Sequence, residues 1–101
     1  MHKLYVVVRS DLKKSYQAVQ AGHAVAGFVY KYQGRFWNNE TLIYLKASPQ
    51  TFAKYLKGSS FPYPAYYFCE PDMNYETTAF AVAIHTGVYG DKSLFPRLKK
   101  M

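Results

Sequence analysis

The residues whose types and spacing could support chemistry lie in one stretch, residues 9–24, which reads Arg-Ser-Asp-Leu-Lys-Lys-Ser-Tyr-Gln-Ala-Val-Gln-Ala-Gly-His-Ala. On a helix, where successive residues are about 100° apart, Gln20 and His23 point the same way. An imidazole has an ordinary pKa of about 6.5 and can take a proton near neutral pH, while an amide can hold a water or a substrate. The pair therefore predicts a site for acid–base chemistry. The alternative is that both residues are structural or surface residues.

The helix that carries this pair is expected from Tyr16 to about Tyr32, with Ser15 as its N-cap residue. The side expected to pack on a sheet contains Ala18, Ala21, Gly22, Val25, Val29 and Tyr32. The opposite side is expected to carry Tyr16, Gln20, His23, Gly27 and Lys31, with Ala24 beside them. Its small side chains would leave room for a ligand or for close backbone packing, and the spacing does not decide between them.

The remaining elements follow from apolar runs and turn residues. Strands are expected at residues 4–8, 41–47, 65–69 and 77–85, each apolar on both faces. Ser48-Pro49 predicts the start of a short helix that ends near Gly58. Breaks are expected at residues 33–35 and 70–74, and Phe36 and Trp37 are expected to cover the core, with a stacking surface as the alternative.

This order of elements predicts one α/β domain over residues 1–101. Its architecture is expected to be a three-layer α/β/α sandwich with a mixed four-stranded sheet, ending in a basic tail at about residues 91–101. Ligands of such sheets usually bind beyond the carboxyl ends of strands. Residues 10–14 and the acidic turn at residues 70–72 both follow strands, so both are expected near a site.

The charge balance favours anionic partners. Thirteen Lys and Arg residues against six Asp and Glu residues give a formal net charge of +7. A solvated basic surface, or a basic tail that touches RNA or a protein, is the alternative interpretation. The eleven tyrosines also permit a homodimer through an aromatic surface.

Cysteine content and hydropathy predict a cytoplasmic protein without a membrane partner. The single Cys69 excludes an internal disulfide, and the sequence has neither a secretory pattern nor an apolar run of about 20 residues. The three histidines are scattered, so we expect no metal site, and no motif predicts a cofactor.

Two segments and one further residue carry a likeness to a known family. Residues 6–13, Val-Val-Val-Arg-Ser-Asp-Leu-Lys, are similar to a first strand that ends in Arg-x-Asp-Leu-Lys, and residues 18–24, Ala-Val-Gln-Ala-Gly-His-Ala, to an Ala-x-Gln-x-x-His-Ala helix. In these segments, in Trp37 and in the order of elements up to about Gly87, the chain resembles the type 2 peptidyl-tRNA hydrolases. The resemblance implies their fold and an esterase that cleaves the bond between a peptide and tRNA.

The chain also departs from this family. Tyr16 stands where the family carries a functional lysine, and residues 70–74 replace its Asp-Ala-Gly and Thr-Gln segments. The chain is therefore expected to be a divergent member or a relative with changed chemistry. The alternative function is a catalytically inactive protein of the same fold that binds or sequesters a nucleotide or another anionic ligand.

The candidate site residues have separate expected roles. For ester hydrolysis, His23 would be the base, Gln20 would hold water or substrate, and Glu70 or Asp72 would orient the imidazole. The candidate ligand-binding or RNA-binding residues are Arg9, Asp11, Lys13, Lys14, Tyr16 and Lys31. As alternatives, Asp11 would only cap a turn, and Glu70 and Asp72 would be ordinary turn residues.

Overall fold

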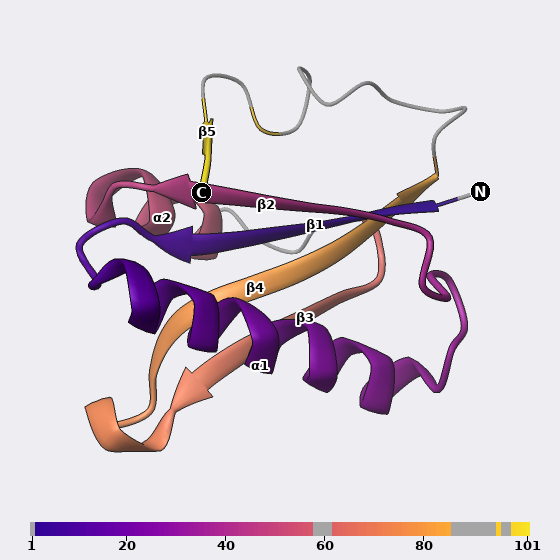
Figure 1. The fold of residues 1–101 in the computed structure, drawn as a ribbon, viewed down its shortest axis with the longest axis horizontal. Coiled ribbons are helices and arrows are strands. Elements are labelled where there is room, and N and C mark those ends of the chain that lie inside the picture. Colours follow the sequence, from indigo (N-terminus) through magenta and orange to yellow (C-terminus); the bar gives the residue numbers. More distant parts are fainter. Residues whose placement is uncertain (1, 58–61, 86–94, 96–97) are drawn as a thin grey trace.

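The computed structural model describes residues 2–57, 62–85, 95 and 98–101. Five strands form one sheet: β1 (His2–Arg9), β2 (Thr41–Ala47), β3 (Ala65–Glu70), β4 (Glu76–His85) and β5 (Lys99–Lys100). Their order across the sheet is β3-β4-β1-β2-β5. β1 and β2 are parallel, whereas β4 is antiparallel to both of its neighbours, β1 and β3. The carboxyl ends of β1, β2 and β3 therefore lie at the same edge of the sheet (Figure 1).

Two helices cover opposite faces of this sheet. The long helix α1 (Lys14–Tyr32) packs on one face, and the short helix α2 (Pro49–Lys57) packs on the other. A single 3-10 turn, η1 (Pro71–Met73), joins β3 to β4. Among the described residues, no helix is long and apolar enough to cross a membrane.

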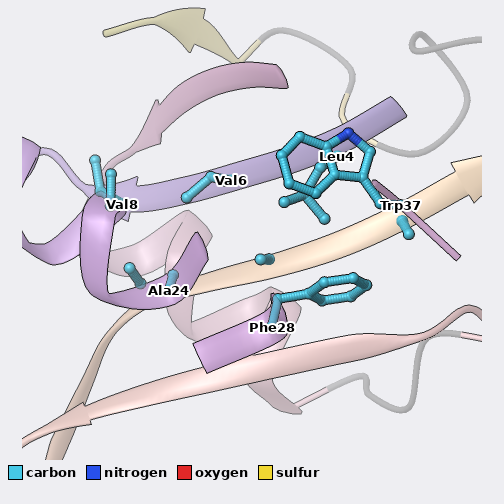
Figure 2. Packing of buried hydrophobic residues seen from close by; sticks show 10 residues of the cluster. Leu4, Val6, Val8, Ala24, Phe28 and Trp37 are labelled. Atoms are coloured by element: carbon cyan, nitrogen blue, oxygen red, sulfur yellow. The ribbon is translucent and has the colours of Figure 1, made fainter. Parts of the chain in front are cut away.

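The central strand β1 divides its side chains between the two faces. Leu4, Val6 and Val8 contribute to the cluster under α1, and Tyr5 and Val7 to the cluster under α2. Successive residues of a strand point to opposite faces, and a helix covers each face, so all five side chains are buried. Each buried side chain of this size contributes about 1.5–3 kcal/mol to folding. Figure 2 shows the α1 side of this core.

The expected strands are found with small shifts, but two details of the sheet prediction are wrong. The sheet has five strands instead of four, because Lys99 and Lys100 pair with the outer edge of β2. Two lysines have no apolar pattern that predicts a strand. β3 is also not covered on both faces: it is an edge strand whose side chains are mostly half-buried, and Cys69 is exposed. Most of the basic tail lies outside the described residues.

The predicted start of α1 is wrong by two residues. Lys13 is the N-cap residue and forms no side-chain cap, and Ser15 lies inside the first turn. Gln17 anchors this end instead, since its buried side-chain amide donates to the carbonyl oxygens of Leu12 (2.7 Å) and Ser10 (3.3 Å). The Gln17 side chain therefore donates to two carbonyl oxygens of the loop that precedes the helix.

The predicted packing face of α1 is rotated in the structure. Ala21 is buried as expected, and Val25 and Tyr32 are partly buried against the core. Ala18, Gly22 and Val29 are exposed, however. The helix buries Gln17, Gln20, Ala24 and Phe28 in their place. Hydropathy misplaced this face because the two glutamines find hydrogen-bond partners inside the protein.

The signals between α1 and α2 behave as predicted except at Phe36, which was expected to cover the core and is 43% exposed. Gln33 (φ 52°) and Gly34 (φ 81°) adopt left-handed conformations that end α1. Trp37 is 5% exposed and its Nε1 donates to the Thr41 carbonyl oxygen over 2.9 Å, so it covers the core. Ser48 Oγ accepts from the Thr51 backbone N–H (3.2 Å) and caps α2, whose predicted end near Gly58 lies outside the described residues.

Candidate functional site

The candidate site lies where the carboxyl end of β3 meets the first half of α1. Glu70, the last residue of β3, is 8% exposed. Its Oε1 accepts from the Tyr16 hydroxyl (2.9 Å) and from Gln20 Nε2 (2.8 Å), and its Oε2 accepts from the backbone N–H of Asp72 (3.4 Å). Since Glu70 also begins the 3-10 turn, the backbone that follows β3 helps to orient its carboxylate.

Gln20 connects three elements at this point. Its side chain is fully buried, Nε2 donates to Glu70 of β3, and Oε1 accepts from the hydroxyl of Thr78 in β4. Both polar atoms of the amide are therefore used inside the protein. The expectation that Gln20 holds water or substrate is not met: the residue positions Glu70 instead.

Tyr16, Gln20, Glu70 and Thr78 form the Glu70 cluster, and their hydrogen bonds set its charge state. Donation from Gln20, then from Tyr16, lowers the pKa of the Glu70 carboxyl, with smaller contributions from the Asp72 backbone and the nearby His23. The same bond to Glu70 raises the pKa of the Tyr16 hydroxyl. Near neutral pH, the cluster therefore contains an ionised carboxylate and a tyrosine that keeps its proton.

His23 lies one helical turn beyond Gln20, at the surface, and makes the smallest electrostatic contribution to the pKa of Glu70. Its ring stacks on Phe68 of β3, with 4.5 Å between ring centroids and 9° between ring planes. Among the described residues, it forms no hydrogen bond or ion pair. The stacking thus fixes the plane of an exposed imidazole whose nitrogens remain open to a ligand.

Gly27 and Lys31, which were predicted on the same side of α1 as Gln20 and His23, also lie along β3. A Cβ added to Gly27 would come within 2.1 Å of Tyr66 Cε2, and Lys31 Nζ donates to the Ala65 carbonyl oxygen (3.1 Å). The space beside Gly27 is therefore used for close packing and not for a ligand. Lys31 is also about 22 Å along the helix from Tyr16, so the structure does not bring it to the candidate site.

Arg9 and Asp11 form a pair of their own. The guanidinium donates to both carboxylate oxygens of Asp11 (3.1 and 2.8 Å) and contacts Glu76 Oε1 at 3.3 Å. Hydrogen bonding to Arg9 lowers the pKa of Asp11. Arg9 also lines a groove of about 320 Å³ on the α2 side, next to Phe52. Its charge is already compensated within the protein.

The other predicted site residues lie around the cluster without joining it. Lys13 and Lys14 are exposed at the start of α1, two to three residues before Tyr16. The Asp72 side chain is exposed, and only its backbone contacts Glu70. Within the described residues, no three histidine, cysteine or acidic side chains group together as a metal site would require.

Thr78 is the site residue that sequence reasoning missed. It lies in an apolar run that reads only as a buried strand, and 58 residues separate it from its partner Gln20. Thr78 lies at the shift in the pairing of β3 with β4, between the partners Ala79 and Thr77, and the rotation of α1 brings Gln20 to its hydroxyl. A second threonine at the start of an apolar strand, with a buried hydroxyl to satisfy, was the available signal.

Comparison with known proteins adds no family assignment. No protein-family model matches the chain, and no curated protein matches it.

Proposed function

We propose that this protein is an esterase of the peptidyl-tRNA hydrolase type, which cleaves the bond between the carbonyl of a peptide and a ribose oxygen of tRNA. One observation carries the proposal: an exposed imidazole, His23, stacks on Phe68, two residues before an ionised carboxylate, Glu70, that three donors hold in place. The resemblance of residues 6–13 and 18–24 to the type 2 family supplies the choice of ester, and the proposed fold is the three-layer sandwich of that family.

The proposed reaction uses His23 as the base. The imidazole takes a proton from water while the water oxygen attacks the ester carbonyl, and it later returns the proton to the ribose oxygen that leaves. The negative charge of Glu70 stabilises the imidazolium that forms between these steps. Gln20 and Thr78 act as positioning residues because their hydrogen bonds hold this carboxylate against α1.

The proposed contact with tRNA involves the start of α1. Lys13 and Lys14 are exposed there and would attract phosphates next to Tyr16. Arg9 has a smaller role in this proposal than the sequence suggested, since Asp11 and Glu76 already pair with it. The proposed location is the cytoplasm, where tRNA is found.

The test is release of a blocked amino acid from acetyl-aminoacyl-tRNA. Loss of a general base typically costs about 10²–10⁴ in rate, so we expect His23→Asn to reduce kcat by at least about 100-fold. His85→Asn is the matched control, because His85 is also exposed but lies about 20 Å further along β4 than Ala79, the register partner of Phe68. Its expected rate is that of the unchanged protein.

A second variant tests the carboxylate. Glu70→Gln keeps an acceptor for Tyr16 and Gln20 but removes the charge, so we expect a lower kcat with nearly unchanged KM. Circular dichroism would verify that each variant is folded. Full activity of His23→Asn, or no release by the unchanged protein, would contradict the proposal.

An inactive binding protein is the alternative outcome of this experiment. Absence of turnover together with tight binding of a nucleotide would support that function. Stacking of a base on Trp37 has no support, because this ring is buried and its N–H already has an acceptor.

A further inference from the structure

A second cavity lies at the carboxyl ends of β1 and β2, away from the Glu70 cluster. It has a volume of about 250 Å³, and four segments of the chain meet around it. The residues that line it are Ser10, Lys46, Ala47, Ser48, Thr51, Leu98 and Lys99. We propose that this cavity binds a phosphate group.

The main argument is a pair of like charges. Lys46 of β2 and Lys99 of β5 are direct register partners in an antiparallel pairing, so their side chains lie on the same face of the sheet. Like charges directly opposite each other destabilise a sheet. Neither lysine forms an ion pair with any described residue, and none of the described residues lining the cavity is acidic. A bound anion would remove this repulsion.

The neutral residues around the cavity suit the same ligand. Ser10 and Thr51 contribute hydroxyl groups that can donate to phosphate oxygens, whereas the Ser48 hydroxyl donates to Thr51 Oγ1. Ser48 and Thr51 hold each other at 3.1 Å between Oγ and Oγ1, so their positions are set before a ligand arrives. Because a water takes up about 30 Å³ in the liquid, 250 Å³ accommodates a phosphate group with part of what it is attached to.

The position of the cavity indicates where such a phosphate would come from. β2 and β3 end at the same edge of the sheet, three strand positions apart, which corresponds to about 14 Å. One strand of RNA lying along this edge could therefore reach both the cavity and Glu70. The inference extends the proposed function to the RNA backbone, but it does not depend on ester hydrolysis, and free phosphate carries the same chemistry.

The experiment compares two double variants that lose the same charge. Lys46→Gln with Lys99→Gln removes both cavity lysines, whereas Lys54→Gln with Lys57→Gln removes two exposed lysines of α2 that do not line the cavity. Calorimetric titration at constant ionic strength would measure binding of inorganic phosphate and, separately, of single-stranded pentauridylate RNA. We expect the cavity variant to bind at least tenfold more weakly, because it loses the charge-assisted hydrogen bonds of both lysines. The control should bind as the unchanged protein does.

Thermal unfolding supplies a readout that guards against misfolding. In chloride, the cavity variant should melt at the same temperature as the unchanged protein or higher, because the repulsion is gone. Phosphate stabilises folded proteins in general, so in phosphate at the same ionic strength the unchanged protein and the control should gain more stability than the cavity variant. Binding of RNA without binding of inorganic phosphate would identify the RNA backbone as the source, and binding of inorganic phosphate alone would identify a free-phosphate site.

Two results would overturn the inference: equal loss of binding in both double variants, which would indicate only a general basic surface, or no binding of either probe. Neither probe contains the ester, so failure of hydrolysis leaves this test unaffected.

Discussion

At the scale of single residues, Glu70 shows how a carboxylate becomes a fixed part of a site. Its hydrogen bonds to Tyr16 and Gln20 come from side chains 54 and 50 residues away, so the folded chain alone supplies them. They favour the ionised form, which lowers the pKa of Glu70. Charge and stability are therefore coupled at this residue.

This coupling predicts acid sensitivity. A carboxyl whose folded pKa lies below its unfolded value of about 4.3 stabilises the protein fully above that pH, and this stabilisation is lost as pH falls through the folded pKa. We expect the free energy of unfolding to decrease below about pH 4.3, and to decrease less steeply in Glu70→Gln. Urea unfolding followed by Trp37 fluorescence at several pH values would measure both. The exposed Glu40→Gln is the control that should keep the full decrease, and an equal slope in Glu70→Gln would contradict the prediction.

At the scale of elements, α1 is positioned by its contacts along β3. Tyr16 and Gln20 bind one end of the strand, His23 stacks on its middle, and Lys31 binds its other end. Gly27 lets the helix approach closely enough for all these contacts. The candidate site therefore depends on the packing of a whole helix and not on a local motif.

Substitution of glycine by alanine is expected to have opposite effects on stability at the two glycines of α1, Gly22 and Gly27. Gly27→Ala places a Cβ 2.1 Å from the Tyr66 ring, and such overpacking typically destabilises by about 1–3 kcal/mol. Gly22→Ala meets no atom within 4 Å, so alanine should stabilise the helix by about 0.5–1 kcal/mol. Urea unfolding of both variants would measure these changes. If Gly27→Ala were as stabilising as Gly22→Ala, the close contact between α1 and β3 would be wrong.

At the scale of the whole molecule, one sheet joins two apolar clusters. β1 and β4 contribute to both, since their alternate side chains face α1 on one side and α2 on the other. Damage on one face should therefore weaken the other, and the protein should unfold in one cooperative step.

A substitution on the α2 side tests this with a reporter on the α1 side. Leu45→Ala removes a buried side chain of the α2-side cluster, and such changes cost about 2–5 kcal/mol. Trp37 belongs to the opposite cluster, yet its fluorescence should report the same loss as far-ultraviolet circular dichroism. Leu42→Ala, on the same strand at 41% exposure, should cost less than about 1 kcal/mol. Two separate transitions in Leu45→Ala would show that the faces unfold independently.

Local patterns in the sequence were sufficient for most of the element boundaries. The bounds of β2, the Ser48 cap of α2, the end of α1 at Gln33 and the burial of Trp37 all followed from neighbouring residues. Apolar runs, caps and left-handed turns act within a few residues, so their signals are present in the linear chain.

The tertiary structure alone decided the rotation of α1, the partners of Gln20, the role of Thr78 and the addition of β5. Hydropathy placed Gln20 on the side of the helix that faces away from the sheet. Burial of an amide is favourable only where distant groups form hydrogen bonds with it, and hydropathy does not include such groups. Glu70 and Thr78 are those groups, 50 and 58 residues away along the chain. Two lysines likewise become a strand only because β2 offers them an unpaired edge. Polar burial and edge pairing depend on partners that the folded chain brings together, so the sequence pattern could not predict them.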